Sequence, residues 1–130
     1  MILLDTHSWV WVAAQSERLS QKAIDEYYRA RETKAVYISA ISVWEVFLLS
    51  SKGRIRLPDS PAALLANTEQ DDAVSIVPID ARIARLAVEL PDIHRDPADR
   101  MILATAQEMG ARVVSKDERL REYRVAEVVW

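Results

Sequence analysis

The sequence predicts an α/β fold in which a short parallel sheet carries helices on both faces. Two observations lead to this prediction. Short apolar or β-branched runs alternate along the chain with longer segments whose apolar residues recur at helical spacing. Most of these longer segments begin at a Ser or Asp that suits a helix N-cap. Strands that alternate with helices in this way are usually parallel and joined by right-handed crossovers.

Five short segments are expected to be strands. The first is continuous and apolar, as in a strand that is buried on both faces. In the third, Pro78 must lie at the strand end, because proline has no amide to donate to a ladder. The expected strands are Met1–Leu4, Val36–Ser39, Ser75–Ile79, Arg112–Ser115 and Val125–Val129.

The segments between the strands are expected to be helices, each marked by a start signal. Proline at the first helical position supports two of the starts, since its missing amide costs nothing there. Gly53 is expected to end the helix that starts at Ser42, Gly110 the helix that starts at Asp96, and Pro91 the helix that starts at Asp80. The expected starts are Ser8, Ser20, Ser42, Ser60, Asp80, Asp96 and Asp117.

Composition places limits on function. The chain has 130 residues, of which 50% are hydrophobic and 28% charged, so we expect one globular domain over residues 1–130. The absence of cysteine excludes disulfides and thiolate metal sites. No apolar run is long enough to span a bilayer and no signal peptide is recognisable, so we expect a cytoplasmic protein. A net charge of -3 disfavours non-specific nucleic-acid binding but allows a local basic patch.

Acidic residues recur where the predicted strands end. Asp5 follows the first strand and Asp117 the fourth, while Glu45 and Asp99 are expected in the first turns of helices. Strand carboxyl ends and helix amino ends share one edge of such a sheet, and ligands bind at that edge. We therefore expect these four carboxylates to converge.

Each acid taken alone also has a structural interpretation. Ser42 and Glu45 fit a capping box, and the remaining acids, Asp80 among them, fit N-caps or first-turn positions favoured by the helix dipole. Asp5 is harder to explain in this way. A carboxylate at the end of a central strand costs several kcal/mol unless hydroxyls, amides, an arginine or a metal ion compensate it.

Taken together, the acids indicate a site for a divalent metal ion. Converging carboxylates repel one another, and a cation relieves that repulsion. Ligand sets made only of oxygen favour Mg²⁺ or Mn²⁺ over zinc. Phosphodiester hydrolysis is a reaction that uses such a site.

Four motifs occur in a fixed order: LLDTH at residues 3–7, SVWEV at 42–46, DPADRMILATA at 96–106 and VSKDE at 114–118. This order resembles that of the PIN-domain ribonucleases and, more narrowly, the VapC-type toxins of toxin–antitoxin pairs. The resemblance implies a three-layer α/β/α sandwich around a short central parallel sheet. It also implies Mg²⁺ or Mn²⁺ as cofactor, RNA as substrate, a cognate antitoxin as partner, and a homodimer.

The resemblance also assigns roles to residues. The catalytic and metal-binding acids are Asp5, Glu45, Asp99 and Asp117, with Asp5 and Asp99 as the primary ligands. Thr6 and Ser115 are expected to orient these carboxylates, and Asp96 to cap a helix or lie behind the ligands. A water molecule activated by the metal is expected to hydrolyse the RNA and leave a 5′-phosphate and a 3′-hydroxyl. The residues expected to contact RNA phosphates are Arg54, Arg95, Arg100 and Lys116.

Two alternatives stay open at this stage. Phosphotransfer enzymes also place an Asp after a first parallel strand, but the haloacid-dehalogenase type needs a second acid where this chain has His7, and the response-regulator type needs an acidic pair that we do not find. The other alternative is a PIN-fold module that binds RNA or regulates without catalysis. The complete set of four acids argues against it.

Overall fold

The computed structural model describes all residues from Met1 to Trp130. Its five strands form one parallel sheet in the order β3-β2-β1-β4-β5, with β1 at the centre between β2 and β4. The strands are β1 (Ile2–Leu4), β2 (Val36–Ser39), β3 (Val74–Val77), β4 (Arg112–Val114) and β5 (Val128–Val129).

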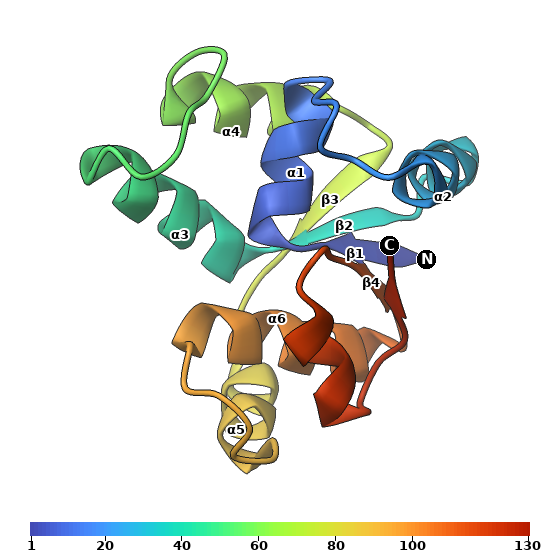
Figure 1. Cartoon of the computed structure of the whole chain (residues 1–130), viewed down its shortest axis with the longest axis vertical. Coiled ribbons are helices and arrows are strands. Elements are labelled where there is room, and N and C mark those ends of the chain that lie inside the picture. The colour runs from blue at the N-terminus through green and yellow to red at the C-terminus, as the bar shows by residue number, and fades with distance from the viewer.

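Helices cover both faces of the sheet and make three layers (Figure 1). One layer contains α1 (Thr6–Ala13), α2 (Gln21–Glu32), α3 (Ala40–Ser51) and α4 (Pro61–Gln70). The other contains α5 (Ala81–Glu89), α6 (Pro97–Met109) and a short 3₁₀ helix, η1 (Glu118–Tyr123). The expected α/β/α sandwich with a short central parallel sheet is therefore confirmed. None of the helices has the length and apolar character needed to cross a membrane.

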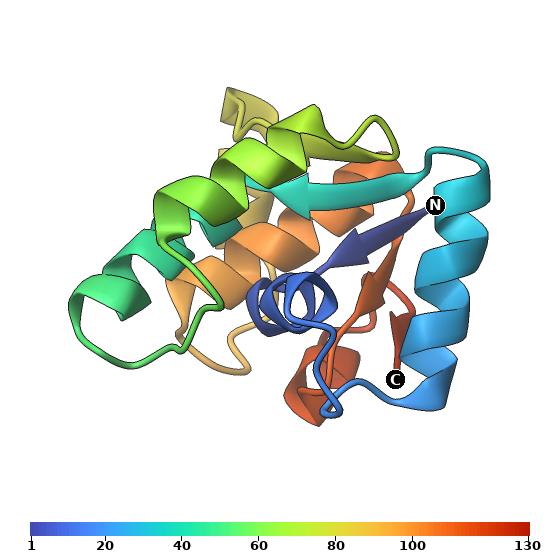
Figure 2. The same cartoon turned by 90° about the horizontal axis from the view of Figure 1, so that it is seen from above.

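The central strand divides the core in two. Ile2 and Leu4 pack with the α1, α2 and α4 layer, whereas Leu3 faces the opposite cluster around Ile102 and Leu103 of α6. All three residues of β1 are at most 1% exposed, so the strand is apolar on both faces, as its sequence requires. β1 and β2 start on the side of α2 and run away from it (Figure 2).

Two expected helix starts are wrong, and both errors bear on the site. α1 begins at Thr6 with Asp5 as its N-cap, whereas Ser8 lies inside the helix and donates to the Val114 carbonyl at 2.9 Å. α3 begins at Ala40 with Ser39 as its N-cap, so Ser42 does not form a capping box with Glu45. Glu45 therefore lies in the second turn of α3, where its carboxylate is free of a capping role.

The other boundaries agree closely with the expected ones. Ser20, Ser60, Asp80 and Asp96 each cap the helix that follows, and Gly110 ends α6 in the left-handed conformation with φ 66. β3 runs from Val74 to Val77, so Pro78 lies just beyond it, and β5 is shorter than expected, with only Val128–Val129.

Candidate active site

Asp5 lies at the end of β1 and is 9% exposed. Its side chain caps α1 by accepting the Ser8 amide at 2.7 Å through Oδ1, and Oδ2 accepts the Ser115 hydroxyl. Burial raises the pKa of Asp5 above its usual value, and these hydrogen bonds offset part of the rise. Both carboxylate oxygens are thus held in place by neutral donors.

Ser115 connects two of the acids across the sheet edge. Its hydroxyl donates to Asp5 and accepts the Asp117 amide at 3.0 Å. The contact with Asp5 is the one expected from the sequence. The Thr6 hydroxyl donates to the Ser42 hydroxyl at 3.0 Å, and a hydrogen bond from Thr6 also lowers the pKa of Glu45.

Asp99 shows that the acids are close enough to act on one another. It lies in the first turn of α6, behind the N-cap Asp96, whose Oδ1 accepts the Ala98 amide at 2.9 Å. Burial raises the pKa of Asp99 to about 7, and the charges of Asp96, Glu45, Asp117 and Asp5 contribute to that rise. Acids from four separate segments therefore repel the same carboxylate.

Glu45 joins these acids from α3. The side chain is partly buried, and burial raises its pKa. The charges of Asp96 and Asp5 raise it further, while a nearby Thr6 hydroxyl and His7 lower it. We call the five residues Asp5, Glu45, Asp96, Asp99 and Asp117 the acidic edge.

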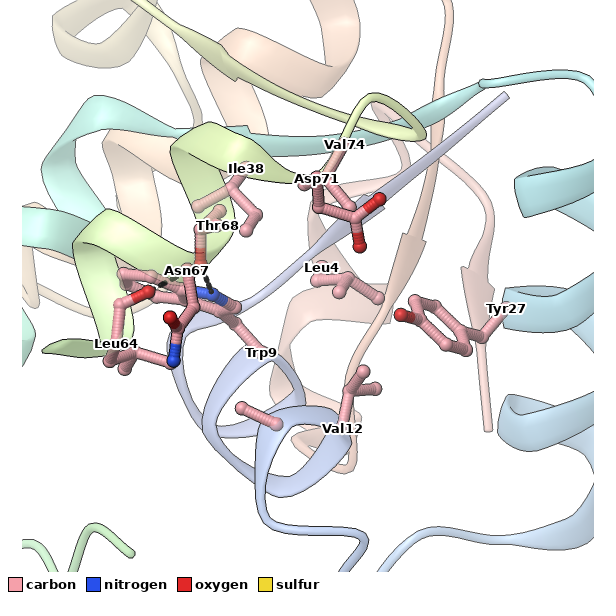
Figure 3. Close-up of a pocket in the computed structure, with 11 residues that line it drawn as sticks. Leu4, Trp9, Val12, Tyr27, Ile38, Leu64, Asn67, Thr68, Asp71 and Val74 are labelled. Atoms are coloured by element: carbon pink, nitrogen blue, oxygen red, sulfur yellow. Dashed lines mark hydrogen bonds between the residues drawn. The ribbon is translucent and has the colours of Figure 1, made fainter. Parts of the chain in front are cut away.

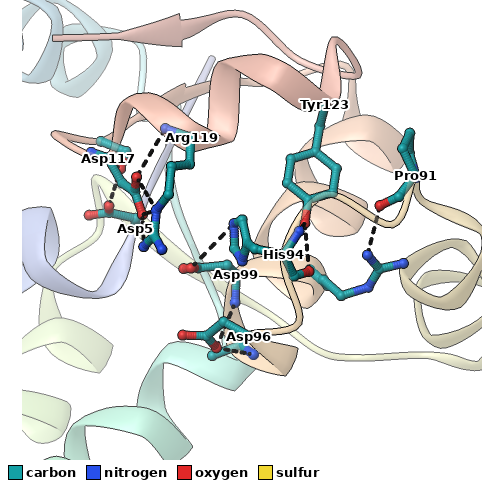
Figure 4. Close-up of polar contacts among 11 residues, drawn as sticks. Asp5, Pro91, His94, Asp96, Asp99, Asp117, Arg119 and Tyr123 are labelled. Carbon is teal, nitrogen blue, oxygen red and sulfur yellow. Dashed lines mark hydrogen bonds and ion pairs between the residues drawn. The ribbon is translucent and has the colours of Figure 1, made fainter.

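Asp117 is the member of the acidic edge that has a full cationic partner. The Arg119 guanidinium donates to Asp117 Oδ2 at 2.7 Å from one nitrogen and to Oδ1 at 3.0 Å from another. These bonds hold the pKa of Asp117 below its usual value. Figure 4 shows Asp5 and Asp117 near each other, with Asp99 and Asp96 on the same side of the molecule.

His94 is a member of the site that the sequence did not indicate. It lies in the polar loop between α5 and α6, but its side chain is only 14% exposed and its Nε2 lies 3.8 Å from Asp99 Oδ2. The Tyr123 hydroxyl of η1 holds the loop, because it donates to the His94 carbonyl at 2.9 Å and accepts the His94 amide at 3.1 Å (Figure 4). This contact spans 29 residues, so no local pattern reveals it.

The PIN domain family matches residues 2–126, which is nearly the whole chain. The chain belongs to the PIN-domain family. It is 39% identical over 124 residues to Ribonuclease VapC22 of Mycobacterium tuberculosis, covering 95% of this chain and 92% of that protein.

Solved structures share the fold of this PIN domain. VapBC2 from Rickettsia felis, solved bound to a DNA fragment from its promoter, superposes with a TM-score of 0.72 at 14% identity, covering 98% of this chain and 97% of the other. FitAcB from Neisseria gonorrhoeae superposes with a TM-score of 0.66 at 22% identity, covering 98% and 96%. DNA-bound VapBC from Salmonella typhimurium gives 0.67 at 21% identity, covering 98% and 95%. At these identities the likeness concerns the fold.

The acidic edge of this PIN domain has the chemistry of a site for a hard divalent cation. Its donors are all carboxylate oxygens, which Mg²⁺ and Mn²⁺ prefer. Burial and the neighbouring acids raise the pKa of Asp99, and a bound cation would offset both effects. No three acidic or histidine side chains are arranged to hold an ion as they stand. Arg119 engages Asp117 and Ser115 engages Asp5, so some side chains have to turn for metal binding.

The three arginines and one lysine that were expected to contact RNA differ in their exposure and in their hydrogen bonds. Arg54, Arg95 and Lys116 are exposed. Arg100 is occupied, because its guanidinium donates to four carbonyls around the end of α5, among them Leu90 at 2.8 Å and Ala87 at 3.0 Å. Arg100 therefore ties α6 to α5, and we omit it from a surface for RNA.

A pocket of about 200 Å³ lies under α1 and α4, away from the acidic edge (Figure 3). It is mostly apolar, and the Trp9 indole at its wall donates to the Thr68 hydroxyl at 3.0 Å. Its one acid, Asp71, is paired with Arg31. Trp9 is 3% exposed and belongs to the core, so it is not available to stack on a base.

Proposed function

We propose that this PIN domain, over residues 1–130, is a metal-dependent endoribonuclease that acts as the toxin of a type II toxin–antitoxin system. The main support is the grouping of Asp5, Glu45, Asp99 and Asp117 at one edge, where burial and, next to it, the charges of Asp96 and the other three acids raise the pKa of Asp99 to about 7. A 39% identical protein of almost the same length bears the name Ribonuclease VapC22.

We propose Mg²⁺ or Mn²⁺ as the cofactor, with Asp5 and Asp99 as primary ligands and Glu45 and Asp117 completing the site. When bound, the cation would neutralise the scissile phosphate and supply a nucleophile by lowering the pKa of water. Water as nucleophile leaves the RNA 2′-hydroxyl unused, so the products carry a 5′-phosphate and a 3′-hydroxyl.

The chain's own residues prepare the site. The Ser8 amide and the Ser115 hydroxyl fix the Asp5 carboxylate before any ligand binds. Ser115 also positions the turn that carries Asp117 through the Asp117 amide. His94 Nε2 lies 3.8 Å from Asp99 Oδ2, beside the acidic edge.

We propose a cognate antitoxin and a second copy of the chain as protein partners, and cytoplasmic RNA as substrate. The solved structures of VapBC2 and FitAcB share the fold over almost all of this chain. Trp44 and Phe47, one turn apart on α3, are 54% and 41% exposed. Large hydrophobic side chains exposed together are typical of protein-binding surfaces.

The test is incubation of the purified protein with total RNA and Mg²⁺ or Mn²⁺, and in parallel with EDTA. We expect cleavage that requires the metal, and sequencing adaptors that ligate only to 5′-phosphates should capture the new ends. Cleavage that persists in EDTA, or ends with a 2′,3′-cyclic phosphate, would contradict the mechanism. RNA that is bound but not cut would instead identify a catalytically silent RNA-binding module.

A further inference from the structure

We infer that a basic pocket beside the acidic edge binds one nucleotide of a single-stranded RNA next to the scissile phosphate. The inference rests on the proposed ribonuclease function and names residues that contact the substrate. The basic pocket is lined by His7, Trp11, Arg18, Arg54 and Arg56, with a few small and apolar side chains as its floor. No acidic side chain lines it.

The pocket is formed by two segments that lie far apart in the sequence. α1 supplies His7 and Trp11, and the loop after α3 supplies Arg54 and Arg56. Gly53, with φ 65, turns the chain at the end of α3. Packed and exposed side chains alternate in this loop. Ile55 and Leu57 pack on the core, whereas Arg54 and Arg56 are exposed.

The charge of the pocket suits a polyanion. Arg18, Arg54 and Arg56 make no ion pair, whereas seven other arginines of the chain do, so these three guanidinium groups are free to bind phosphate. A cluster of three unpaired arginines is unexpected in a protein with a net charge of -3. Arginine forks match phosphate oxygens better than lysine does.

The size and the walls of the pocket suit a nucleobase. Its volume is about 470 Å³, within the range of about 300–1,000 Å³ that small-ligand sites span. His7 and Trp11 have ring centroids 5.7 Å apart, and Arg18 lies 5.9 Å from the Trp11 ring. Aromatic and guanidinium planes are the surfaces on which unpaired bases stack.

The position of the pocket links it to the chemistry. His7 lies in the first turn of α1, the helix that Asp5 caps, and it also lines the basic pocket, so it connects the acidic edge with the basic pocket. A strand that places a phosphate at the acidic edge therefore has its neighbouring nucleotide within reach of the arginines. The acidic edge alone repels RNA, and the basic pocket supplies the attraction that brings the strand there.

The test measures binding without cleavage. A fluorescein-labelled single-stranded RNA of about 12 nucleotides is titrated with protein in EDTA, and anisotropy gives the Kd over a range of salt concentrations. We expect the double variant R54Q/R56Q to weaken binding at least about 10-fold and to flatten the salt dependence, since each lost phosphate contact on a single strand removes about 0.7 from the slope. R18Q is expected to act in the same direction with a smaller effect.

R124Q is the matched control, because Arg124 is also exposed and makes no ion pair but lies at the C-cap of η1 and does not line this pocket. It should leave the Kd unchanged. The same RNA carrying 4-thiouridine should crosslink on irradiation to the peptides that contain Trp11 or Arg54. Equal weakening by R124Q and R54Q/R56Q, or crosslinks confined to other peptides, would overturn the inference.

The remaining outcomes separate this inference from the proposed function. If R54Q/R56Q binds RNA normally but loses a co-expressed antitoxin, the pocket is a protein interface and the inference is wrong. If RNA binds through the arginines but is never cut with Mg²⁺ or Mn²⁺, the proposed nuclease function is wrong and the inferred RNA-binding pocket is supported. If R54Q/R56Q retains full metal-dependent cleavage at low RNA concentration, the inferred RNA-binding pocket is wrong and the proposed nuclease function is supported.

Discussion

The two ends of the sheet treat acidic side chains in opposite ways. At the amino ends of the strands, Glu26 of α2 contacts Arg112 at the start of β4, and Asp71 and Asp72 pair with Arg31 and Lys34. At the carboxyl ends, Asp5, Glu45 and Asp96 have no ion pair. There Arg119 pairs with Asp117, and the His94 ring lies 3.8 Å from Asp99.

The pKa values record the same contrast. Hydrogen bonds from Arg112 and Arg31 lower the pKa of Glu26 and Asp71. At the other end, burial raises the pKa of Asp5, Glu45 and Asp99. Paired acids stabilise the fold, whereas buried and crowded acids destabilise it unless a ligand compensates them. The end of the sheet that is costly for stability is therefore the end that is suited to function.

The largest effect is expected from removing a carboxylate of the acidic edge. Asp5→Asn and Asp99→Asn should each lower RNA cleavage with Mg²⁺ by about 100-fold or more, because each removes a charged ligand and leaves a neutral amide. Asn keeps an oxygen that accepts the Ser8 amide, so α1 should stay capped. The initial rate of cleavage of a labelled RNA is the measurement.

Asp80→Asn is the matched control for these variants. Asp80 also follows a strand and caps a helix, accepting the Ile83 amide at 2.8 Å, but it is exposed and stands outside the acidic edge. It should cleave RNA at the rate of the unmodified protein. A similar loss in Asp80→Asn would mean that the acids act through the fold alone.

The next effect concerns stability with and without metal. In EDTA, Asp99→Asn should have a higher thermal midpoint than the unmodified protein, because the repulsion around position 99 is gone. Mg²⁺ at about 100 times its Kd should stabilise the unmodified protein by about 2.7 kcal/mol and the variant by much less. Differential scanning fluorimetry measures both. A metal-induced shift of the same size in the two proteins would argue that the ion binds elsewhere.

At the other end of the sheet, the expected effect is on stability alone. Glu26→Gln should lower the free energy of unfolding by about 1–2 kcal/mol, because it removes the charge from a hydrogen bond between α2 and β4. Urea denaturation measures the change. RNA cleavage by the folded protein should stay unchanged, and a loss of cleavage would show that the two ends of the sheet are coupled.

The smallest effect is the pH dependence of that contact. Arg112 lowers the pKa of Glu26 in the folded protein below its ordinary value of 4.5. Stability from this contact is therefore fully present above about pH 4.5 and is lost as the pH falls through the lower, folded pKa. The difference in unfolding free energy between the unmodified protein and Glu26→Gln should shrink below pH 4.5. A difference that stays constant down to pH 3 would exclude an ionic origin.

Much of the fold follows from local patterns. The apolar run of β1, the caps at Ser20, Ser60, Asp80 and Asp96, and Gly110 after α6 all lie where the sequence predicts them. The errors at Ser8 and Ser42 have a common reason. Each serine has the right chemistry for a cap, but another polar residue, three positions earlier, is the actual N-cap.

The sequence by itself determined an α/β chain whose acids follow its strands, because helix caps, apolar periodicity and strand ends depend on neighbours along the chain. Only the tertiary structure decided which charges meet. Ser115 reaches Asp5 across 110 positions, His94 lies beside Asp99 because Tyr123 holds its loop, and Arg54 and His7 line one pocket. These contacts depend on the order of strands in the sheet and on long-range packing, which no local pattern specifies.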